Sequence, residues 1–450
     1  KNMLRHENGY YTQEECMELE QYAWERGITV IPEIDMPGHS AAFKRAMGHS
    51  MQTDEGVEEL LHILEEVAAT FPHSPYIHIG GDEEPITYPD FFKIITDKVH
   101  SLSKKVIVWN PIYGYEINSE DGFDMTQMWS TAGEKVDNIP NIDCRYNYIN
   151  HFDVFADVVG IYKSNIYYSE VGSEEIAGTI TAVWNDRKLP TSEDIMMQNN
   201  FYANVLASAE RAWAGGGNAY IEDSGTTLPC CGDEYDEFAD WERRFLHYKN
   251  TIISDEPVPY VRQTNIKWRI TEAFPNDGDA EKSFPPENHI NSISPNQFEY
   301  QGNTYNTDIA CGGGIYLRHT WGKTVPAHFD DPQINHTAYA WTYIYSPKKQ
   351  TVGALIEFQN YSRSELDKVP DNKSWDKKGS RIWLNGNELY PENWSNHNIE
   401  INHEIDLKNE NFSARNPLLV ELKRGWNKVF TKLPYIKAEG VRLNKWMFTF

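Results

Sequence analysis

The chain has 450 residues, more than one ordinary domain holds, and this length predicts two or three compact units. A formal net charge of −26 argues against nucleic acid or an anionic membrane as a partner. No apolar run reaches the ~20 residues that a membrane-spanning helix needs. The first residues show no signal-peptide pattern, although such a segment could already have been removed.

Five cysteines match no zinc-binding spacing, and their odd number leaves at least one thiol without a partner in the chain. Cys16 falls on the apolar face of a predicted helix and is expected in a core. Cys230 and Cys231 are adjacent in a Gly-rich loop, where they could be free or bridged.

The first predicted elements alternate between helix and strand. Thr12 and Glu15 form a capping box that opens a helix ending at Gly27. A strand over 28–35 follows, and an apolar stripe then predicts a helix from Val57 to Phe71. The later elements of this half are strands at 76–80, 106–109, 125–129, 143–149 and 179–184, with helices over 88–102 and 195–213.

Alternating strands and helices predict a parallel sheet. Nearly every predicted strand ends in an acid or an aromatic residue, and in a (β/α)8 barrel these ends converge on one mouth. A doubly wound sheet would instead gather ligands at a single crevice. The fold prediction is therefore an α/β TIM-type barrel over residues 1–250. Only six of its eight strands are visible, and the shortfall lies at the front. Either the other two strands belong to a segment absent from this chain, or the barrel is open.

The second half has a different pattern. A helix with Phe238, Trp241, Phe245 and Tyr248 on one face precedes a linker at 251–265. Residues 266–450 then read as short alternating strands separated by turns, which predict an antiparallel β-sandwich. Asn385-Gly386 signals a hairpin. The predicted strands are 339–345, 352–358, 381–384, 418–422, 427–433 and 442–450.

One stretch concentrates the chemistry. The strand that begins at Tyr76 stops at Gly80-Gly81 and releases Asp82, Glu83 and Glu84. Glycines permit a sharp turn, and crowded carboxylates raise the pKa of at least one of them, as a general acid near neutral pH requires. The alternative is a solvated acidic loop. Aromatic residues at neighbouring strand ends favour a sugar-binding site, although any single Trp could simply pack in a core.

Two runs carry a family resemblance. Residues 78–83, His-Ile-Gly-Gly-Asp-Glu, resemble the catalytic strand of the family-20 glycoside hydrolases, the β-N-acetylhexosaminidases. Residues 27–40, Gly-Ile-Thr-Val-Ile-Pro-Glu-Ile-Asp-Met-Pro-Gly-His-Ser, look like the strand and loop that precede it in that family. The resemblance extends over about residues 10–215, more weakly toward Ala209–Trp213.

The resemblance implies a retaining, substrate-assisted exo-hydrolase that acts on terminal β-GlcNAc or β-GalNAc. Glu83 would be the general acid, and Asp82 would orient the 2-acetamido group and stabilise the oxazolinium ion. The expected substrate-binding residues are Trp109, Trp129, Tyr148, Trp184, Asp186 and His39. Asp35, His78 and Glu33 would support them from behind.

Several features depart from the family pattern. The sugar-binding Arg of the first strand is absent from the visible strands, and Tyr148 competes with Tyr146 for one role. The usual Tyr-x-Asp is not matched; Asp153 is the nearest acid. Residues 425–429 look weakly like a galactose-binding-like module, and a purely structural module is the alternative.

Two other functions compete. An incomplete barrel could bind saccharide without turning it over, and His39, His78, Asp82 and Glu84 could instead hold a metal. The leading prediction needs no metal and no cofactor. It takes an oligosaccharide or glycoconjugate as its substrate, and the resemblance implies a secreted or periplasmic location. Neither the GlcNAc or GalNAc preference nor the oligomeric state follows from the sequence.

Overall fold

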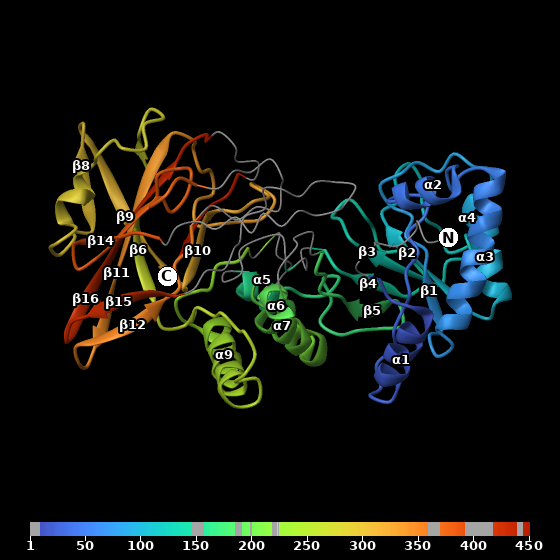
Figure 1. The fold of residues 1–450 in the computed structure, drawn as a ribbon. Coiled ribbons are helices and arrows are strands. Elements are labelled where there is room, and N and C mark those ends of the chain that lie inside the picture. The colour runs from blue at the N-terminus through green and yellow to red at the C-terminus, as the bar shows by residue number, and fades with distance from the viewer. Residues whose placement is uncertain are drawn as a thin grey trace. The chain divides into compact units, whose positions relative to one another are not determined.

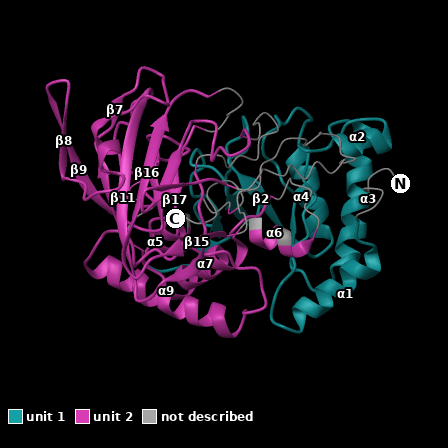
Figure 2. Ribbon diagram, turned by 60° about the vertical axis from the view of Figure 1, so that its left-hand side comes forward, with its two compact units in different colours: residues 1–146, 171–180 teal, residues 147–170, 181–450 magenta. Residues whose placement is uncertain are grey.

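A computed structural model describes residues 10–145, 149, 157–184, 191–198, 200–217, 223, 225–358, 370–391, 417–438 and 444–450. The chain divides into two compact units (Figure 2), one of residues 1–146 and 171–180, the other of residues 147–170 and 181–450. The predicted domain boundaries at 250 and 266 stay a prediction. Within the described residues, no helix combines the length and the apolar composition that a membrane crossing requires.

The first unit contains a five-stranded sheet whose strands follow one another in chain order and are all parallel (Figure 1). A parallel bridge from Glu33 to His78 adds the preceding segment at the β1 edge. This confirms the predicted parallel α/β arrangement, and closure into an eight-stranded barrel stays a prediction. The strands are β1 (Tyr76–His78), β2 (Lys105–Asn110), β3 (Met125–Met128), β4 (Asn141–Asp143) and β5 (Ile176–Thr179).

Helices pack against this sheet. In α1 (Gln13–Trp24) both hydrogen bonds of the predicted capping box are present. The apolar stripes of α3 (Asp54–Thr70) and α4 (Phe91–Ser101) enter one buried cluster with β1 and β2. The short helix α2 (Ala41–Met47) was not predicted, because its one turn of apolar residues is too brief for a periodic signal.

Several predicted elements differ from the structure, and the strand predicted over 28–35 is present only as the bridge at Glu33. Strand β4 ends at Asp143, where the prediction began, because its carboxylate accepts from the backbone N–H of Arg145 and turns the chain. Strand β5 starts earlier than predicted, since Gly178 interrupts its apolar pattern. The helix predicted over 195–213 is two helices, separated at Asn200, whose φ of 43° is left-handed. These helices are α6 (Ser192–Gln198) and α7 (Phe201–Ala214).

The second unit joins a helical cluster to antiparallel sheets. Its helices α5 (Asp157–Lys163), α7 and α9 (Asp233–Thr251) share one hydrophobic cluster. The largest sheet has the order β14-β13-β16-β11-β6-β9-β8, and smaller sheets pair β10 with β17 and β12 with β15. Side chains from the large and small sheets meet in a common core, which confirms the predicted antiparallel β architecture.

The second unit's strands confirm some predicted positions and add others. Asn385 and Gly386, both at positive φ, connect β13 to β14 as predicted. Strand β9 was not predicted, because most of its side chains are exposed and show no apolar alternation. The elements are β6 (Lys267–Thr271), β7 (Phe274–Pro275), η2 (Pro285–His289), β8 (Gln297–Tyr300), β9 (Asn303–Cys311), β10 (Gly314–Arg318), β11 (His336–Ser346), β12 (Gln350–Ala354), β13 (Arg381–Leu384), β14 (Asn387–Leu389), β15 (Leu418–Leu422), β16 (Gly425–Tyr435) and β17 (Trp446–Thr449).

Candidate active site

The site begins where the extended segment around Glu33 runs beside β1. The backbone N–H of Ile34 donates to His78 O at 2.9 Å, and the N–H of Met36 donates to Ile79 O at 3.1 Å. This pairing brings Asp35 against the turn at Gly80, whose φ is +71°. A Cβ at Gly80 would lie 1.8 Å from Asp35 Oδ1, so only glycine permits this approach.

Asp82 is a buried carboxylate at the end of this turn. It is 9% exposed, and its Oδ1 has no hydrogen-bond partner among the described residues. Burial, together with the charges of Asp35 and Glu83, raises the pKa of Asp82 to about 7. An uncompensated buried carboxylate is costly, and such groups concentrate where a ligand or a reaction uses them.

Glu83 is the exposed neighbour of Asp82. Its carboxylate Oε2 lies 2.9 Å from His39 Nε2, and both side chains are more than half exposed. Both residues have left-handed backbones, with φ of 58° at Glu83 and 46° at His39. Non-glycine residues rarely adopt this region, and functional sites are where it is concentrated. Two residues of this kind are in contact here, which indicates that the loops around His39 and Glu83 have a functional role.

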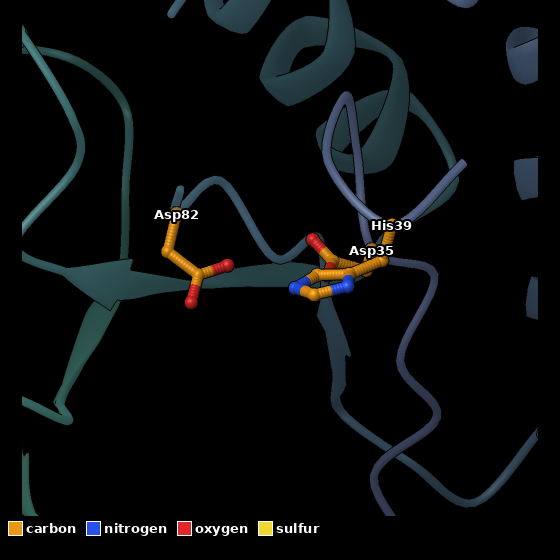
Figure 3. A group of neighbouring side chains, drawn as sticks. All are labelled: Asp35, His39 and Asp82. Carbon is orange, nitrogen blue, oxygen red and sulfur yellow. The ribbon is translucent and has the colours of Figure 1, made fainter. Parts of the chain in front are cut away.

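The loop that carries His39 packs directly on the Asp82 turn. A Cβ at Gly38 would lie 3.0 Å from the Asp82 carbonyl oxygen, tighter than most real contacts. Figure 3 shows the Asp35, His39 and Asp82 side chains gathered at one place. One ligand atom from each lies within 4.8 Å of the others. These three groups could hold a metal ion. The predicted metal alternative named a different set, with His78 and Glu84 in place of Asp35.

Glu33, His78 and Trp109 form a second group of side chains next to these loops. Trp109 Nε1 donates to Glu33 Oε1 at 2.9 Å, and His78 Nδ1 lies 3.3 Å from the same oxygen. The His78 and Trp109 rings meet edge to face at 4.7 Å between centroids. Burial alone would raise the pKa of Glu33, but the contacts from His78 and Trp109 outweigh it and lower the pKa. Glu33 is therefore held as an anion. Asp35 differs, since burial and the Glu33 charge raise its pKa.

The structure gathers most of the predicted residues of the first unit. Contacts and neighbouring charges link Glu33, Asp35 and His39 with His78, Asp82, Glu83 and Trp109. Trp129 follows β3, the strand next to β2, and its Nε1 donates to Pro111 O at 3.1 Å. It is half-buried at the same carboxyl edge of the sheet. Its contact with sugar stays a prediction.

For the other predicted residues, a place at this site stays a prediction. Trp184 is 41% exposed and belongs to the second unit. Tyr148 and Asp186, with the alternatives Tyr146 and Asp153, lie outside the described residues. Their roles stay predictions.

One pair at a strand end was missed by sequence reasoning. Asp143 ends β4, and Arg145 Nε and Nη2 donate to its two carboxylate oxygens at 3.1 and 3.0 Å. Both side chains are almost fully buried. The signal was available as an acid and an arginine two residues apart, but the prediction put them at the beginning of a strand over 143–149, where the side chains would not reach the carboxyl edge of the sheet. The parallel sheet places this pair at the same edge as Asp82.

Comparisons with known proteins agree with the motif resemblance. Residues 1–61 match the model of "Glycosyl hydrolase family 20, catalytic domain". A beta-hexosaminidase of Vibrio furnissii is 43% identical over 99 residues, covering 17% of this chain and 16% of its own. Beta-hexosaminidase A of Caenorhabditis briggsae is 24% identical over 277 residues, covering 45% and 49%.

A solved structure is also similar. The GH20 exo-beta-N-acetylglucosaminidase of Vibrio harveyi, crystallised as an inactive mutant, aligns with a TM-score of 0.42 at 20% identity. That alignment covers 56% of this chain and 46% of the other. The chain spans less than half the length of each of these relatives. The family match over residues 1–61 and the two relatives show that the chain is similar to the catalytic domain of glycoside hydrolase family 20 and to beta-hexosaminidases.

Proposed function

We propose that the chain carries the active site of a retaining exo-β-N-acetylhexosaminidase that removes terminal β-GlcNAc or β-GalNAc by substrate-assisted catalysis. The observation that carries this proposal is the pairing of two unlike carboxylates on adjacent residues. Asp82 is buried with an unpartnered oxygen, whereas Glu83 is exposed and contacts His39. Adjacent acids in different environments suit two different tasks.

Glu83 is the proposed general acid. Its exposure places it where a glycosidic oxygen can reach it, and the His39 contact fixes the carboxyl group. The acid first gives a proton to the departing oxygen and then, as a base, takes one from the attacking water. The positive φ at Glu83 turns its side chain away from the buried direction that Asp82 takes.

Asp82 is the proposed partner of the 2-acetamido group. As the acetamido oxygen attacks the anomeric carbon, the neutral amide becomes an oxazolinium cation. A carboxylate fixed beside the amide N–H then stabilises the transition state more than the ground state. The unpartnered Oδ1 of Asp82 is the acceptor that the N–H requires. No carboxylate of the protein acts as nucleophile in this scheme.

The remaining groups shape the site. Trp109, Trp129 and Trp184 are proposed to wall the acetamido pocket, Tyr148 to donate to the acetamido oxygen, and Asp186 to bind a sugar hydroxyl. Asp35 supports the Asp82 turn, while Glu33 and His78 position Trp109. We place the protein in a secreted or periplasmic compartment, where glycoconjugates with terminal N-acetylhexosamine are met.

The proposal is tested by hydrolysis of a chromogenic β-GlcNAc glycoside. Glu83→Gln keeps the shape of the side chain but removes its proton, and kcat should fall by about 10²- to 10⁴-fold. The matched control is Glu58→Gln, a carboxylate exposed on α3, which should retain full activity. Unchanged activity in Glu83→Gln removes Glu83 from its role. Sugar binding without turnover in the wild type refutes the enzyme and leaves a saccharide-binding protein.

A further inference from the structure

Two cysteines of the second unit, far apart in the sequence, come together at the end of β9. Cys311 is the last residue of β9, and Cys230 lies in the loop that leads into α9. An isolated antiparallel bridge pairs Leu228 with Cys311, so this loop runs alongside the end of the strand. Lys267, the β6 residue paired with Cys311, donates from Nζ to the Cys230 carbonyl oxygen at 3.0 Å.

The side chains are in contact as well as the backbones. Cys311 is 1% exposed in the cluster formed with α5, α7 and α9, and Cys230 packs against that same cluster. Each thiol acts on the ionisation of the other, so the two side chains lie close together, and Cys311 Sγ donates to Gln263 O at 3.9 Å. The adjacent Cys231 is exposed and does not belong to the cluster. Of the two neighbouring cysteines, Cys230 is therefore the one that packs with Cys311 in this cluster.

We propose that Cys230 and Cys311 are a disulfide-forming pair that ties the loop before α9 to the end of β9. The proposal concerns the second unit alone and does not depend on the hydrolase activity. Bridged cysteines are typical of proteins that leave the reducing cytosol. The modification is a disulfide between Cys230 and Cys311, and Cys231 remains a thiol.

The oxidation balances with a small disulfide, such as oxidised glutathione, as the oxidant. The Cys230 thiolate attacks one sulfur of the oxidant, forms a mixed disulfide and expels one thiolate. The Cys311 thiolate then attacks Cys230 Sγ and expels the second. Two protein thiols lose two electrons and two protons, and one small disulfide becomes two thiols.

Cys230 suits the first role because it is the less buried of the two. Burial raises the pKa of Cys311 to about 12, and the pKa of Cys230 is raised also, again chiefly by burial. The resolving attack by Cys311 is the slower step in the folded chain, because little of its thiol is ionised near neutral pH. Refolding from the reduced, unfolded chain avoids this barrier, since both thiols are then open to solvent.

The test is to refold the full chain in a glutathione redox buffer and map its peptides by mass spectrometry without reduction. The expected product is a peptide pair linked between Cys230 and Cys311, with two fewer thiols reactive in denaturant than after reduction. Reduction should lower the melting temperature by several degrees, because the bond restricts the unfolded chain.

Variants separate this pair from its neighbour. Cys231→Ser should keep the linked peptide and the effect of reduction on melting. Cys230→Ala, a substitution in a partly exposed loop, should lose both, and Cys311→Ser should behave like Cys230→Ala. A bond from Cys231 to Cys230 or to Cys311 overturns the proposal. A full count of reactive thiols after refolding overturns it too, as does a wild-type melting temperature that reduction leaves unchanged.

Discussion

Two buried carboxylates, one in each unit, have opposite surroundings: hydrogen-bond donors surround the first, whereas the second lies beside other acids. Glu242 of α9 is fully buried, and four donors reach its oxygens: Tyr260 Oη, the backbone N–H groups of Gln263 and Thr264, and Thr264 Oγ1. Arg262 Nε lies 3.6 Å away. Asp82 has an unpartnered oxygen and two carboxylates as neighbours.

The difference separates structural acids from chemical ones. Glu242 ties the chain after α9 to the helix, so its charge serves the fold. Asp82 stabilises nothing comparable in the described part of the chain, and its surroundings disfavour its charge. A group kept at such a cost is the one that a substrate or transition state would satisfy.

The largest expected effect comes from removing the charge of Asp82. Asp82→Asn should lower kcat on a β-GlcNAc glycoside by about 10²- to 10³-fold, as loss of a preorganised electrostatic group does. Circular dichroism should show the same fold, and steady-state kinetics gives the effect. A variant within threefold of wild type would place Asp82 with the structural acids.

The same substitution, Asp82→Asn, should raise the stability of the protein at pH 8 although it lowers kcat. A carboxylate whose pKa is about 7 when folded, against an ordinary value of 3.8, holds a proton that the unfolded chain has released. Its stabilising contribution is therefore complete below about pH 4 and is lost as the pH rises through 7. At pH 8 the variant should be more stable than wild type, by on the order of 1.4 kcal/mol for each unit of pKa shift.

Urea unfolding at pH 4 and pH 8 measures this difference. The gain should shrink toward zero at pH 4, because this pH lies only just above the ordinary pKa of 3.8 and little of the free-energy difference between the two states has yet built up. A variant less stable than wild type at pH 8 would show that the Asp82 charge is satisfied in the folded protein.

Replacing Glu242, the structural acid, should lower the free energy of unfolding. Glu242→Gln leaves backbone donors of Gln263 and Thr264 facing an amide and should cost about 1 to 3 kcal/mol in the free energy of unfolding. Urea unfolding at pH 8 checks it, with the exposed Glu58→Gln as control. An unchanged free energy of unfolding would mean that its hydrogen bonds do not make Glu242 a structural acid.

A smaller effect on activity is expected from the hydrogen bond between Trp109 and Glu33. Trp109→Phe removes the indole donor of Glu33 and keeps an aromatic face, so the loss is about 1 kcal/mol, or roughly fivefold in kcat/KM. The pKa of Glu33 should rise, because one of the contacts that lower it is gone. An unaltered kcat/KM would assign Trp109 to packing.

The smallest effect is a change in pH dependence. The charge of Asp35 helps to raise the pKa of Asp82, so Asp35→Asn should lower that pKa. If hydrolysis needs ionised Asp82, the acid limb of kcat/KM lies near pH 7 in wild type and moves to lower pH in the variant. A limb that stays in place would mean that another group controls it.

Sequence reasoning predicted the parallel sheet, the capping box of α1 and the Asn385-Gly386 hairpin, because each depends on local pattern. It also predicted that crowded carboxylates would raise a pKa, but connected that shift with the general acid. The structure puts it on Asp82. Which acid is buried depends on the loop at Gly38 folding over the Asp82 turn, a contact between segments that no local pattern encodes.

Contacts across the chain limited the rest of the site prediction. The Glu33–Trp109 hydrogen bond joins residues far apart in sequence, and the Asp143–Arg145 pair was predicted at the beginning of a strand, although it lies at the end of β4. Asn200 separates two helices although one apolar stripe continues past it, because periodicity carries no information on its left-handed backbone conformation.

The central claim is that Asp82 and Glu83 act on the 2-acetamido group of the substrate itself. The direct measurement compares wild-type kcat/KM on nitrophenyl β-GlcNAc and on nitrophenyl β-glucoside, which has a hydroxyl in place of the acetamide. An intramolecular nucleophile predicts at least about a thousandfold preference for the acetamido sugar. Comparable rates on the two glycosides would contradict the account.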